Sequence, residues 1–387
     1  MNKKIKPNNV SETSRRNFFR TSAAAVSAAA LGGLEFSRSA HATGTDTIRV
    51  GIIGCGGRGI GAAVNAMNAD SGARLAAMAD LFGDRVQEAR KRLQKEKPQQ
   101  VAVDDGHCFV GINGYRHVIE SADVVLIACA AKFHPMYLRA AVDAGKHVFV
   151  EKPHAIDPVG VREVTAACEL AKQKKLCVVS GLQSRYHVGY QETMKRIHDG
   201  AIGDIIAIEE NFLRAPYVLV TRKPGLSEVQ YQYSNQYHFA WLSGDDVPQS
   251  LVHNLDRASW VMHEEDPTRA HGLGGRSSSF NEIYGNVFDH HSVIYQYANG
   301  VRLYAFCRTQ VNCYNENSSI ILGSKGRCHL TRMQIEGETN WRYEGPPCNP
   351  YDAEHEKLFA AIRSGNTINN GDYMARSTLI AIMGQIS

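Results

Sequence analysis

The spacing of apolar positions along the chain changes near residue 185. Before this point, short β-branched runs alternate with stretches of helical spacing, and the connections between them are short. Such alternation predicts a parallel sheet covered by helices on both faces, which is a doubly wound α/β fold. The pattern predicts strands at 47–53, 73–79, 122–129, 147–150 and 176–180, and helices at 60–68, 84–97, 135–144 and 158–174.

After residue 185 the strands are longer, and turn residues separate neighbouring pairs. Asn299-Gly300 lies between two alternating runs and is a strong hairpin signal. This half therefore predicts a mostly antiparallel sheet with added helices, and we place one domain at 46–181 and a second at 182–387. The last predicted helix reaches Ser387 without a capping residue, as expected where a chain continues. The predicted strands are 205–213, 293–298, 301–307, 318–322 and 327–330, and the helices are 248–262, 351–364 and 373–386.

The first 42 residues have the pattern of a twin-arginine signal peptide. Ser14-Arg15-Arg16-Asn17-Phe18-Phe19-Arg20 precedes an apolar run of small residues, and Ala40-His41-Ala42 supplies a small-x-small cleavage site. The alternative is a membrane helix, but the apolar run from Thr21 to Gly33 is shorter than the ~20 residues that a span needs. We expect export of the folded protein to a periplasm or the outer face of the membrane, without a stable membrane span.

The charge balance argues against nucleic acid as a partner. Residues 1–42 hold seven Lys/Arg and two Asp/Glu, which leaves 36 basic and 37 acidic residues in the rest of the chain. Phosphate binding needs concentrated positive charge. The nine cysteines include no Cys-x-x-Cys pair, so we expect free thiols and no zinc site. Asp289-His290-His291 suggests metal binding, but neighbouring strand residues face opposite ways, and we predict no metal site.

A glycine-rich turn follows the first predicted strand. Gly54, Gly56 and Gly59 match G-x-G-x-x-G, the pattern that places a dinucleotide pyrophosphate on a helix start, and we assign Arg58 to the same site. Asp80 ends the second strand, where a carboxylate binds the adenosine ribose and repels a 2′-phosphate. We therefore expect a Rossmann domain that binds NAD, with NADP less favoured. The alternative is a turn that only packs.

Lys152 is a candidate catalytic residue. Glu151-Lys152-Pro153 directly follows the strand at 147–150, at the sheet edge where ligands of parallel sheets bind. Lys152 would point to where a nicotinamide lies, so we also assign it to the cofactor site, and its ammonium would stabilise the alkoxide that develops on a substrate hydroxyl. The alternative is a surface lysine ahead of a proline.

His253 is the second catalytic candidate. It lies in the helix predicted at 248–262, with Asp245 or Asp246 as its cap. At 100° per residue, His253 shares a polar face with Gln249 and Asp256, and a neutral imidazole is a suitable base near pH 7. The alternative is a solvated helix face.

Four residues are candidates for substrate binding. Gln249 and Asp256 share the face of His253, and Tyr237 belongs to an aromatic run before the helix, where side chains either stack on a sugar or cover the edge of the core. Arg185 follows the strand at 176–180 and is placed to face the same cleft.

Together these motifs resemble the Gfo/Idh/MocA family of oxidoreductases, from about Ile48 to the end of the chain. The resemblance rests on the glycine fingerprint, Glu151-Lys152-Pro153, His253-Asn254-Leu255-Asp256 and the turn at 322–327. It implies a C-terminal domain with a large open sheet that often mediates oligomers, so we expect a homo-oligomer. It also implies Lys152 and His253 as catalytic positions, and sugars or polyols as substrates. Many members carry Asp where this chain has Gln249, and an amide cannot accept a proton at neutral pH.

Three functions follow from this resemblance. The first is an exported oxidoreductase that moves hydride between a sugar or polyol hydroxyl and a tightly held nicotinamide cofactor, because a periplasm supplies little free NAD. The second is a glycoside hydrolase or lyase that oxidises a sugar transiently, eliminates the aglycone and then returns the hydride. The third is a sugar-sensing domain that keeps NAD without catalysis.

Overall fold

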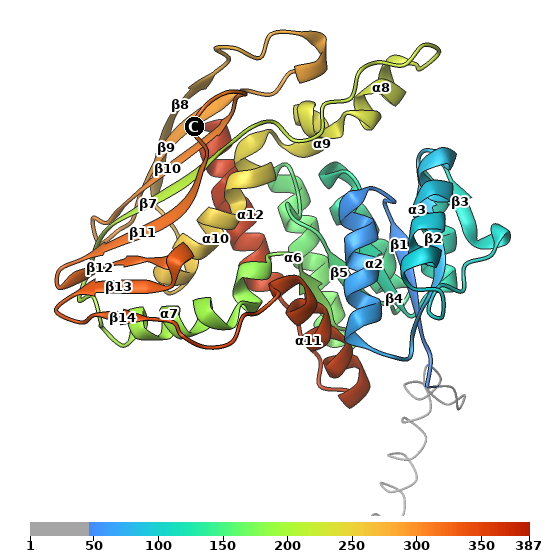
Figure 1. Cartoon of the computed structure of the whole chain (residues 1–387), viewed down its shortest axis with the longest axis horizontal. Helices are drawn as coiled ribbons and strands as arrows, with labels where there is room; N and C mark the ends of the chain where they lie inside the picture. The colour runs from blue at the N-terminus through green and yellow to red at the C-terminus, as the bar shows by residue number, and fades with distance from the viewer. Residues whose placement is uncertain (1–45) are drawn as a thin grey trace, which may run out of the picture. The chain divides into compact units, whose positions relative to one another are not determined.

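The computed structural model of the chain describes residues 46–387, in which residues 47–387 form one unit with two β-sheets (Figure 1). The predicted signal peptide at 1–42 lies outside the described residues. Within the described part, no helix has both the length and the apolar character that crossing a bilayer would require.

The first sheet is parallel throughout, with the strand order β3-β2-β1-β4-β5-β6. All of its strands were predicted except β3. This strand is too short and too exposed to give a buried β-branched run. The order reverses between β1 and β4, so a ligand crevice is expected at the carboxyl ends of these two strands. The strands are β1 (Ile48–Ile53), β2 (Ala73–Asp80), β3 (Cys108–Val110), β4 (Val124–Ile127), β5 (His147–Val150) and β6 (Val178–Ser180).

Helices cover both faces of this sheet, as predicted. Val50 and Ile52 of β1 pack against α2, α3 and α11, whereas Ile53 of β1 and Val125 of β4 belong to the core formed with α4, α5 and α6. The C-terminal helix α11 therefore packs on the N-terminal sheet, which spacing alone did not predict. The six helices are α2 (Gly57–Ala69), α3 (Gly83–Glu96), α4 (Gly114–Ser121), α5 (His134–Asp143), α6 (Pro158–Gln173) and α11 (Pro350–Ser364).

The second sheet has eight strands in the order β14-β13-β12-β11-β7-β10-β9-β8, and only the β7–β10 pair is parallel. The mostly antiparallel sheet is thus confirmed, as is the tight connection at Asn299-Gly300 between β9 and β10. The strands are β7 (Ile205–Arg214), β8 (Arg269–Gly275), β9 (His290–Gln296), β10 (Arg302–Thr309), β11 (Glu316–Gly323), β12 (Gly326–His329), β13 (Gln334–Gly337) and β14 (Trp341–Arg342).

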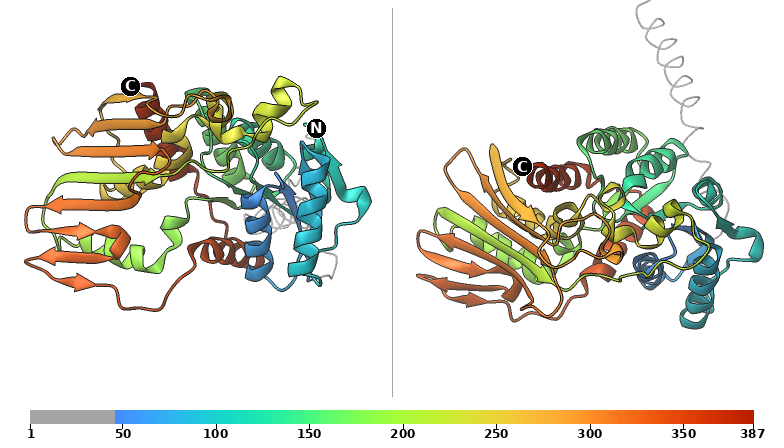
Figure 2. Two further views of the ribbon diagram at one scale, coloured as in Figure 1. Left: turned by 45° about the horizontal axis from the view of Figure 1, so that its top comes forward. Right: turned by 90° about the horizontal axis from the view of Figure 1, so that it is seen from above.

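Three helices cover one face of this second sheet (Figure 2). Met194 of α7, Leu255 of α10 and Ile380 of α12 share a core with the inward side chains of β7 to β12. Two short helices, α8 and α9, belong instead to the segment between β7 and α10, which contacts α3 where Arg85 donates a hydrogen bond to the carbonyl of Ser234. These helices are α7 (Val188–His198), α8 (Glu228–Ser234), α9 (Ala240–Ser243), α10 (Val252–Val261) and α12 (Gly371–Ile386).

The helix predicted at 248–262 begins with a π-helical turn (Val247–Leu251), and α10 follows it directly. Pro248 lies in the first turn, as predicted, but the Asp246 side chain does not cap the helix. Its carboxylate pairs with Arg214 and accepts a hydrogen bond from Ser250 Oγ at 2.7 Å. The Asp246 carboxylate therefore binds the Arg214 guanidinium instead of the backbone N–H groups at the start of the helix.

Candidate active site

The glycine turn after β1 has the geometry of a phosphate cradle. Gly54 has a φ of +100°, and a Cβ on Gly59 would lie 1.8 Å from the Gly54 carbonyl oxygen, so both positions require glycine. A Cβ on Gly56 would meet no described atom within 4 Å, because this residue faces open space at the start of α2. First-turn N–H groups of a helix have no acceptor inside the helix, so a diphosphate fits this space.

Asp80 lies at the end of β2, beside this turn. Its carboxylate accepts hydrogen bonds from the backbone N–H of Cys55 at 2.8 Å and of Phe82 at 3.1 Å. Arg85 stacks over the Phe82 ring and donates to the carbonyl of Ser234 at 3.0 Å, so its guanidinium is already engaged by the chain. The carboxylate of Asp80, unlike the Arg85 guanidinium, is therefore suited to bind a ribose beside the turn.

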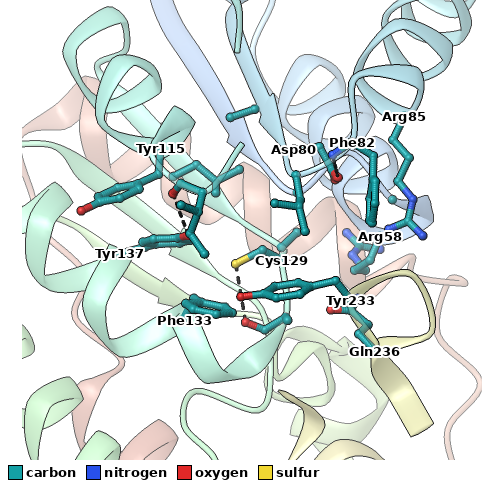
Figure 3. A pocket seen from close by; sticks show the side chains of 18 of the residues that line it. Arg58, Asp80, Phe82, Arg85, Tyr115, Cys129, Phe133, Tyr137, Tyr233 and Gln236 are labelled. Carbon is teal, nitrogen blue, oxygen red and sulfur yellow. Dashed lines mark hydrogen bonds between the residues drawn. The ribbon is translucent and has the colours of Figure 1, made fainter. Parts of the chain in front are cut away.

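A cavity lies over the glycine turn, and we call it the turn cavity (Figure 3). Its walls combine the turn and Asp80 with the aromatic rings of Tyr115, Phe133 and Tyr137. Tyr233 of α8 stacks on Phe133 at a centroid distance of 5.7 Å, so the segment that follows β7 forms a further wall of the cavity. Apolar rings beside a polar cradle suit a nucleotide, which has flat bases and charged phosphates.

Lys152 follows β5 and lines a second cavity, which we call the histidine cavity. Its Nζ donates a hydrogen bond to the backbone carbonyl of Gln249 at 2.7 Å. This bond ties the loop after β5 to the π-helical turn before α10. Both catalytic candidates therefore line one space of about 290 Å³, near the lower end of the ~300–1,000 Å³ typical of small-molecule pockets.

His253 contributes its imidazole to the histidine cavity from the start of α10. Its Nδ1 is shielded from solvent and has no hydrogen-bond partner among the described residues. Burial, together with the positive charges of Lys152 and Arg257, lowers the pKa of His253 well below its ordinary value. The imidazole is therefore neutral at pH 7 and can accept a proton.

The two cavities are neighbours and share lining residues. A small space between them is lined by Lys152 and Gln249, and Arg58 and Tyr237 line this space as well as both larger cavities. A molecule extending from the glycine turn toward His253 would pass these two side chains. Burial raises the pKa of the Tyr237 phenol, so this group remains protonated near neutral pH.

Arg58 points toward the loop after β5 and not only toward the turn that carries it. Its Nε lies 2.6 Å from a carboxylate oxygen of Glu151, and its guanidinium stacks over the Tyr351 ring at 4.7 Å. The pair with Glu151 was not predicted, because spacing alone cannot align a residue after β1 with one after β5. Both residues follow the carboxyl ends of parallel strands, and their proximity could have been inferred from this shared position.

Arg185 and Asp256 need a correction as substrate-binding candidates. Asp256 is 0% exposed, accepts hydrogen bonds from Arg185 at 2.8–3.1 Å and receives another from Ser377 Oγ. Arg185 also pairs with Glu264, and neither Arg185 nor Asp256 lines the cavities described above. Asp256 lies three residues after His253, and the packing of α10 on α12 turns it toward Ser377 instead of the cavity.

The histidine cavity also contains residues that the sequence did not single out. Arg257 follows His253 by one helical turn and lines the cavity with it. Tyr217 comes from the segment after β7, which has no regular spacing. The further members are Gly181, Phe212, Asn317 and Tyr351. Gln183 also lines the cavity, and it belongs to the segment 183–187 that the sequence placed as a candidate to face the cleft.

The nine cysteines, all of which lie in the described part of the chain, are free, as expected. Cys129 lies at the turn cavity, where burial raises the pKa of its thiol. A buried, protonated thiol is a poor nucleophile. The chemistry of the site therefore rests on Lys152, His253 and their polar neighbours.

Comparison with known proteins identifies the first half of the chain. The family model described as "Oxidoreductase family, NAD-binding Rossmann fold", GFO_IDH_MocA, matches residues 48–182. This range contains all six strands of the parallel sheet, the glycine turn, Asp80 and Lys152.

Similar proteins extend the likeness beyond this range. Inositol 2-dehydrogenase from Burkholderia ambifaria is 26% identical over 332 residues, 82% of this chain and 87% of that protein. A glycosyl hydrolase family 109 protein from Shewanella amazonensis is 26% identical over 341 residues, 81% of this chain and 67% of its own. The fold also matches that of levoglucosan dehydrogenase in complex with NADH and levoglucosan, with a TM-score of 0.67, 18% identity and coverage of 87% and 96% of the two chains. Residues 48–182 therefore match the NAD-binding Rossmann domain of the Gfo/Idh/MocA oxidoreductase family.

Proposed function

We propose that the protein is an NAD-dependent oxidoreductase that transfers hydride between a sugar or polyol hydroxyl and a tightly held nicotinamide cofactor. The observation that carries this proposal is the position of Lys152 and His253 in one cavity, which shares Arg58 and Tyr237 as lining residues with the cavity over the glycine turn. Family relatives named for inositol and levoglucosan support a polyhydroxylated substrate.

The two catalytic candidates divide the proton and charge chemistry between them. NAD, when bound, accepts hydride from a carbinol carbon and returns it in the reverse direction. His253 is neutral, so its imidazole accepts the proton of the substrate hydroxyl. Lys152 carries positive charge toward the oxygen from which that proton departs, and stabilises the developing alkoxide. In the reverse reaction the imidazolium of His253 returns the proton to the new hydroxyl.

The cofactor assignment rests on the turn cavity. Gly54, Gly56 and Gly59 leave space for a diphosphate at the start of α2, and Arg58 lies where the cofactor meets the substrate cavity. Asp80 suits a ribose diol and repels a 2′-phosphate. The Arg85 guanidinium donates a hydrogen bond to the Ser234 carbonyl, so it is poorly placed to offset the repulsion between Asp80 and a 2′-phosphate. NAD is therefore favoured over NADP.

Export would make cofactor retention necessary. If residues 1–42 direct the folded protein through the twin-arginine route, the enzyme works where little free NAD is present. Tyr233 and Gln236 of the segment after β7 help to line the turn cavity, which is consistent with slow release. A retained cofactor must be restored in each cycle, so a second carbonyl compound would take the hydride that the first substrate gives up.

The test begins with protein purified without added nucleotide. We expect a released nucleotide that chromatography identifies as NAD or NADH, and turnover of sugars or polyols only when a second carbonyl substrate is present. Protein that contains no nucleotide and does not bind NAD would contradict the proposal.

A second candidate is glycoside cleavage through transient oxidation. Tyr237 places a protonated phenol at the junction of the cavities, and one relative is named a glycosyl hydrolase family 109 protein. In this reaction the hydroxyl becomes a ketone, a base removes a proton from the neighbouring carbon, the aglycone leaves, water adds and the hydride returns. Turnover of a glycoside without any second substrate, with solvent deuterium on the neighbouring carbon, would select this reaction.

A further inference from the structure

Arg257 is a poorly satisfied cation in the wall of the histidine cavity. Only 4% of its side chain is exposed, yet its Nε has no hydrogen-bond partner among the described residues. Its terminal nitrogen makes two long contacts, at 3.4 Å to Glu210 and at 3.3 Å to Asn317. A buried guanidinium usually has short, paired contacts, because leaving a buried charge without them is costly.

Glu210 only partly balances this charge. It is 0% exposed, and its closer partners are uncharged: Asn254 Nδ2 donates to one oxygen at 2.8 Å, and Ser319 Oγ donates to the other. Burial raises the pKa of Glu210 to about 7, although Arg257 acts in the opposite direction. Near neutral pH this carboxyl is therefore protonated in a substantial fraction of molecules, and Arg257 then lacks a counter-ion.

The rest of the cavity does not supply a counter-ion either. Arg58 and Lys152 add two cations to its lining, and the one carboxylate among the lining residues is Glu151, which pairs with Arg58. His253 is held neutral. The histidine cavity therefore has an excess of positive charge. The charge of Lys152 has a proposed catalytic role, whereas the charge of Arg257 has none.

We propose that the substrate carries a carboxylate, as a uronic or aldonic acid does, and that Arg257 and Asn317 bind this group. This inference rests on the proposed function and narrows its substrate class. A guanidinium binds a carboxylate through two parallel N–H···O bonds, which would engage the unpartnered Nε of Arg257. Arg257 follows His253 by one turn of α10, so both side chains face a single bound sugar.

Access to this end of the cavity is open. Asn317 is exposed on β11, so it marks a place where the cavity wall meets solvent and a charged group can enter. Phe212 and Tyr217 line the same cavity and offer apolar faces against which a sugar ring can stack. A carboxylate at Arg257 and a reacting hydroxyl near His253 would then lie on the same ring.

The experiment compares acid sugars with their neutral counterparts on the holoenzyme. Titration calorimetry measures binding of D-glucuronate against D-glucose and of D-galacturonate against D-galactose, and initial rates measure their oxidation. We expect at least one acid to bind about 10- to 100-fold more tightly than its neutral counterpart, which is the range of a charge-assisted hydrogen-bonded pair. Arg257→Gln should remove this preference.

Two further variants keep the result interpretable if Arg257→Gln folds poorly. Asn317→Asp changes an exposed residue, so its fold should persist, and the new carboxylate should pair with Arg257 and lower the acid-to-neutral binding ratio about tenfold. Arg269→Gln removes an exposed arginine of β8 and should leave the ratio unchanged.

The outcomes separate this inference from the proposed function. Equal binding of acid and neutral sugars, tighter binding of D-glucose 6-phosphate than of either acid, no binding of any sugar, or an unchanged ratio in Asn317→Asp would overturn the inference. Oxidation of a neutral sugar would then still support the proposed function. Conversely, an acid that binds through Arg257 but is never oxidised would support the carboxylate site and contradict the oxidoreductase.

Discussion

The ammonium of Lys152 donates a hydrogen bond to the backbone carbonyl of Gln249 at 2.7 Å. The contact joins the carboxyl end of β5 to the π-helical turn that precedes His253, so it links the two halves of the proposed active site. Because the acceptor is a main-chain oxygen, Lys152 is held without a carboxylate at position 249. The amide at this position is therefore compatible with a catalytic lysine, and its side chain remains available to a substrate hydroxyl.

Removing the ammonium should abolish most of the activity. Lys152→Ala should lower kcat about 10²- to 10⁴-fold, because a positioned charge that stabilises a developing alkoxide contributes on this scale. NAD binding should change much less, since the diphosphate rests on the glycine turn. Steady-state kinetics with nucleotide content as a control measures both, and turnover equal to that of the wild type would exclude Lys152 as a catalytic residue.

His253→Ala should give a similar loss of kcat, and the remaining activity should rise with pH. Without an imidazole to accept the proton, the variant depends on hydroxide or on spontaneous ionisation of the substrate. His253→Gln provides a matched control that preserves polarity but cannot accept a proton at neutral pH. If His253→Gln keeps wild-type kcat, the imidazole orients the substrate and does not act as a base.

The dinucleotide preference should depend on Asp80. Replacing it by Ser removes the carboxylate that suits a ribose diol, so NAD should bind about tenfold more weakly and NADP about tenfold more tightly. Fluorescence titration of both nucleotides against stripped protein gives the two dissociation constants. Asp80 also accepts the Cys55 N–H, and Asp80→Asn tests whether this hydrogen bond alone sustains the preference. An unchanged ratio in Asp80→Ser would mean that Asp80 serves only to shape the turn.

Asp256 should matter for stability and not for substrate affinity. Asp256→Asn leaves the buried guanidinium of Arg185 without its main partner, so the free energy of unfolding should fall by about 3–5 kcal/mol. Asp199→Asn removes an exposed ion pair with Lys195 and should change it by less than ~1 kcal/mol. Urea denaturation measures both variants. If Asp256→Asn raises the KM for the sugar without loss of stability, Asp256 binds the substrate.

Acidification should destabilise the fold. Between about pH 6.5 and pH 4 the unfolded chain protonates histidines that burial keeps neutral in the folded protein, and each proton taken up lowers the free energy of unfolding by about 1.4 kcal/mol per pH unit. Glu210, Asp245 and Glu354 act in the opposite direction, because burial raises the pKa of each, to about 7 for Glu210 and Asp245, and they are protonated first in the folded state. Five histidines have a pKa lowered to about 3 or about 4: His134, His154, His238, His291 and His355.

The five histidines outnumber these three carboxyls, so the net effect favours unfolding in acid. The urea midpoint should therefore fall steadily from pH 7 to pH 5. Measurements at constant ionic strength avoid screening effects. A midpoint that stays constant or rises on acidification would show that the buried carboxyls dominate.

Local sequence predicted most of the parallel sheet, because its strands are buried on both faces and form continuous apolar runs. The short edge strand β3 gives no such run. In the second half, β9 and β10 were found from the Asn299-Gly300 turn and their alternation. The strands β8, β13 and β14 were not predicted, because β8 contains three glycines and β13 and β14 lack a run of alternating apolar residues. The helix predicted at 248–262 was found, but its π-helical start was not, since Val247–Leu251 carries no residue that local rules associate with such a turn.

The candidate site was predictable where a motif fixes backbone geometry. Gly54, Asp80 and Lys152 follow parallel strands and converge at one sheet edge. Contacts between distant segments were not predictable from spacing. The pair of Arg58 and Glu151 depends on the relative placement of two strands, and the burial of Asp256 depends on how α12 packs against α10.

The central claim is that a carbinol carbon and the nicotinamide of NAD exchange hydride beside Lys152 and His253. A single-turnover experiment with a substrate deuterated at the carbinol carbon tests it most directly. We predict that the holoenzyme transfers deuterium to the nicotinamide, with a primary isotope effect on the rate, and that Lys152→Ala slows this transfer at least a hundredfold. Turnover that leaves the deuterium on the substrate carbon, with no label on the nicotinamide at any time, would contradict the account.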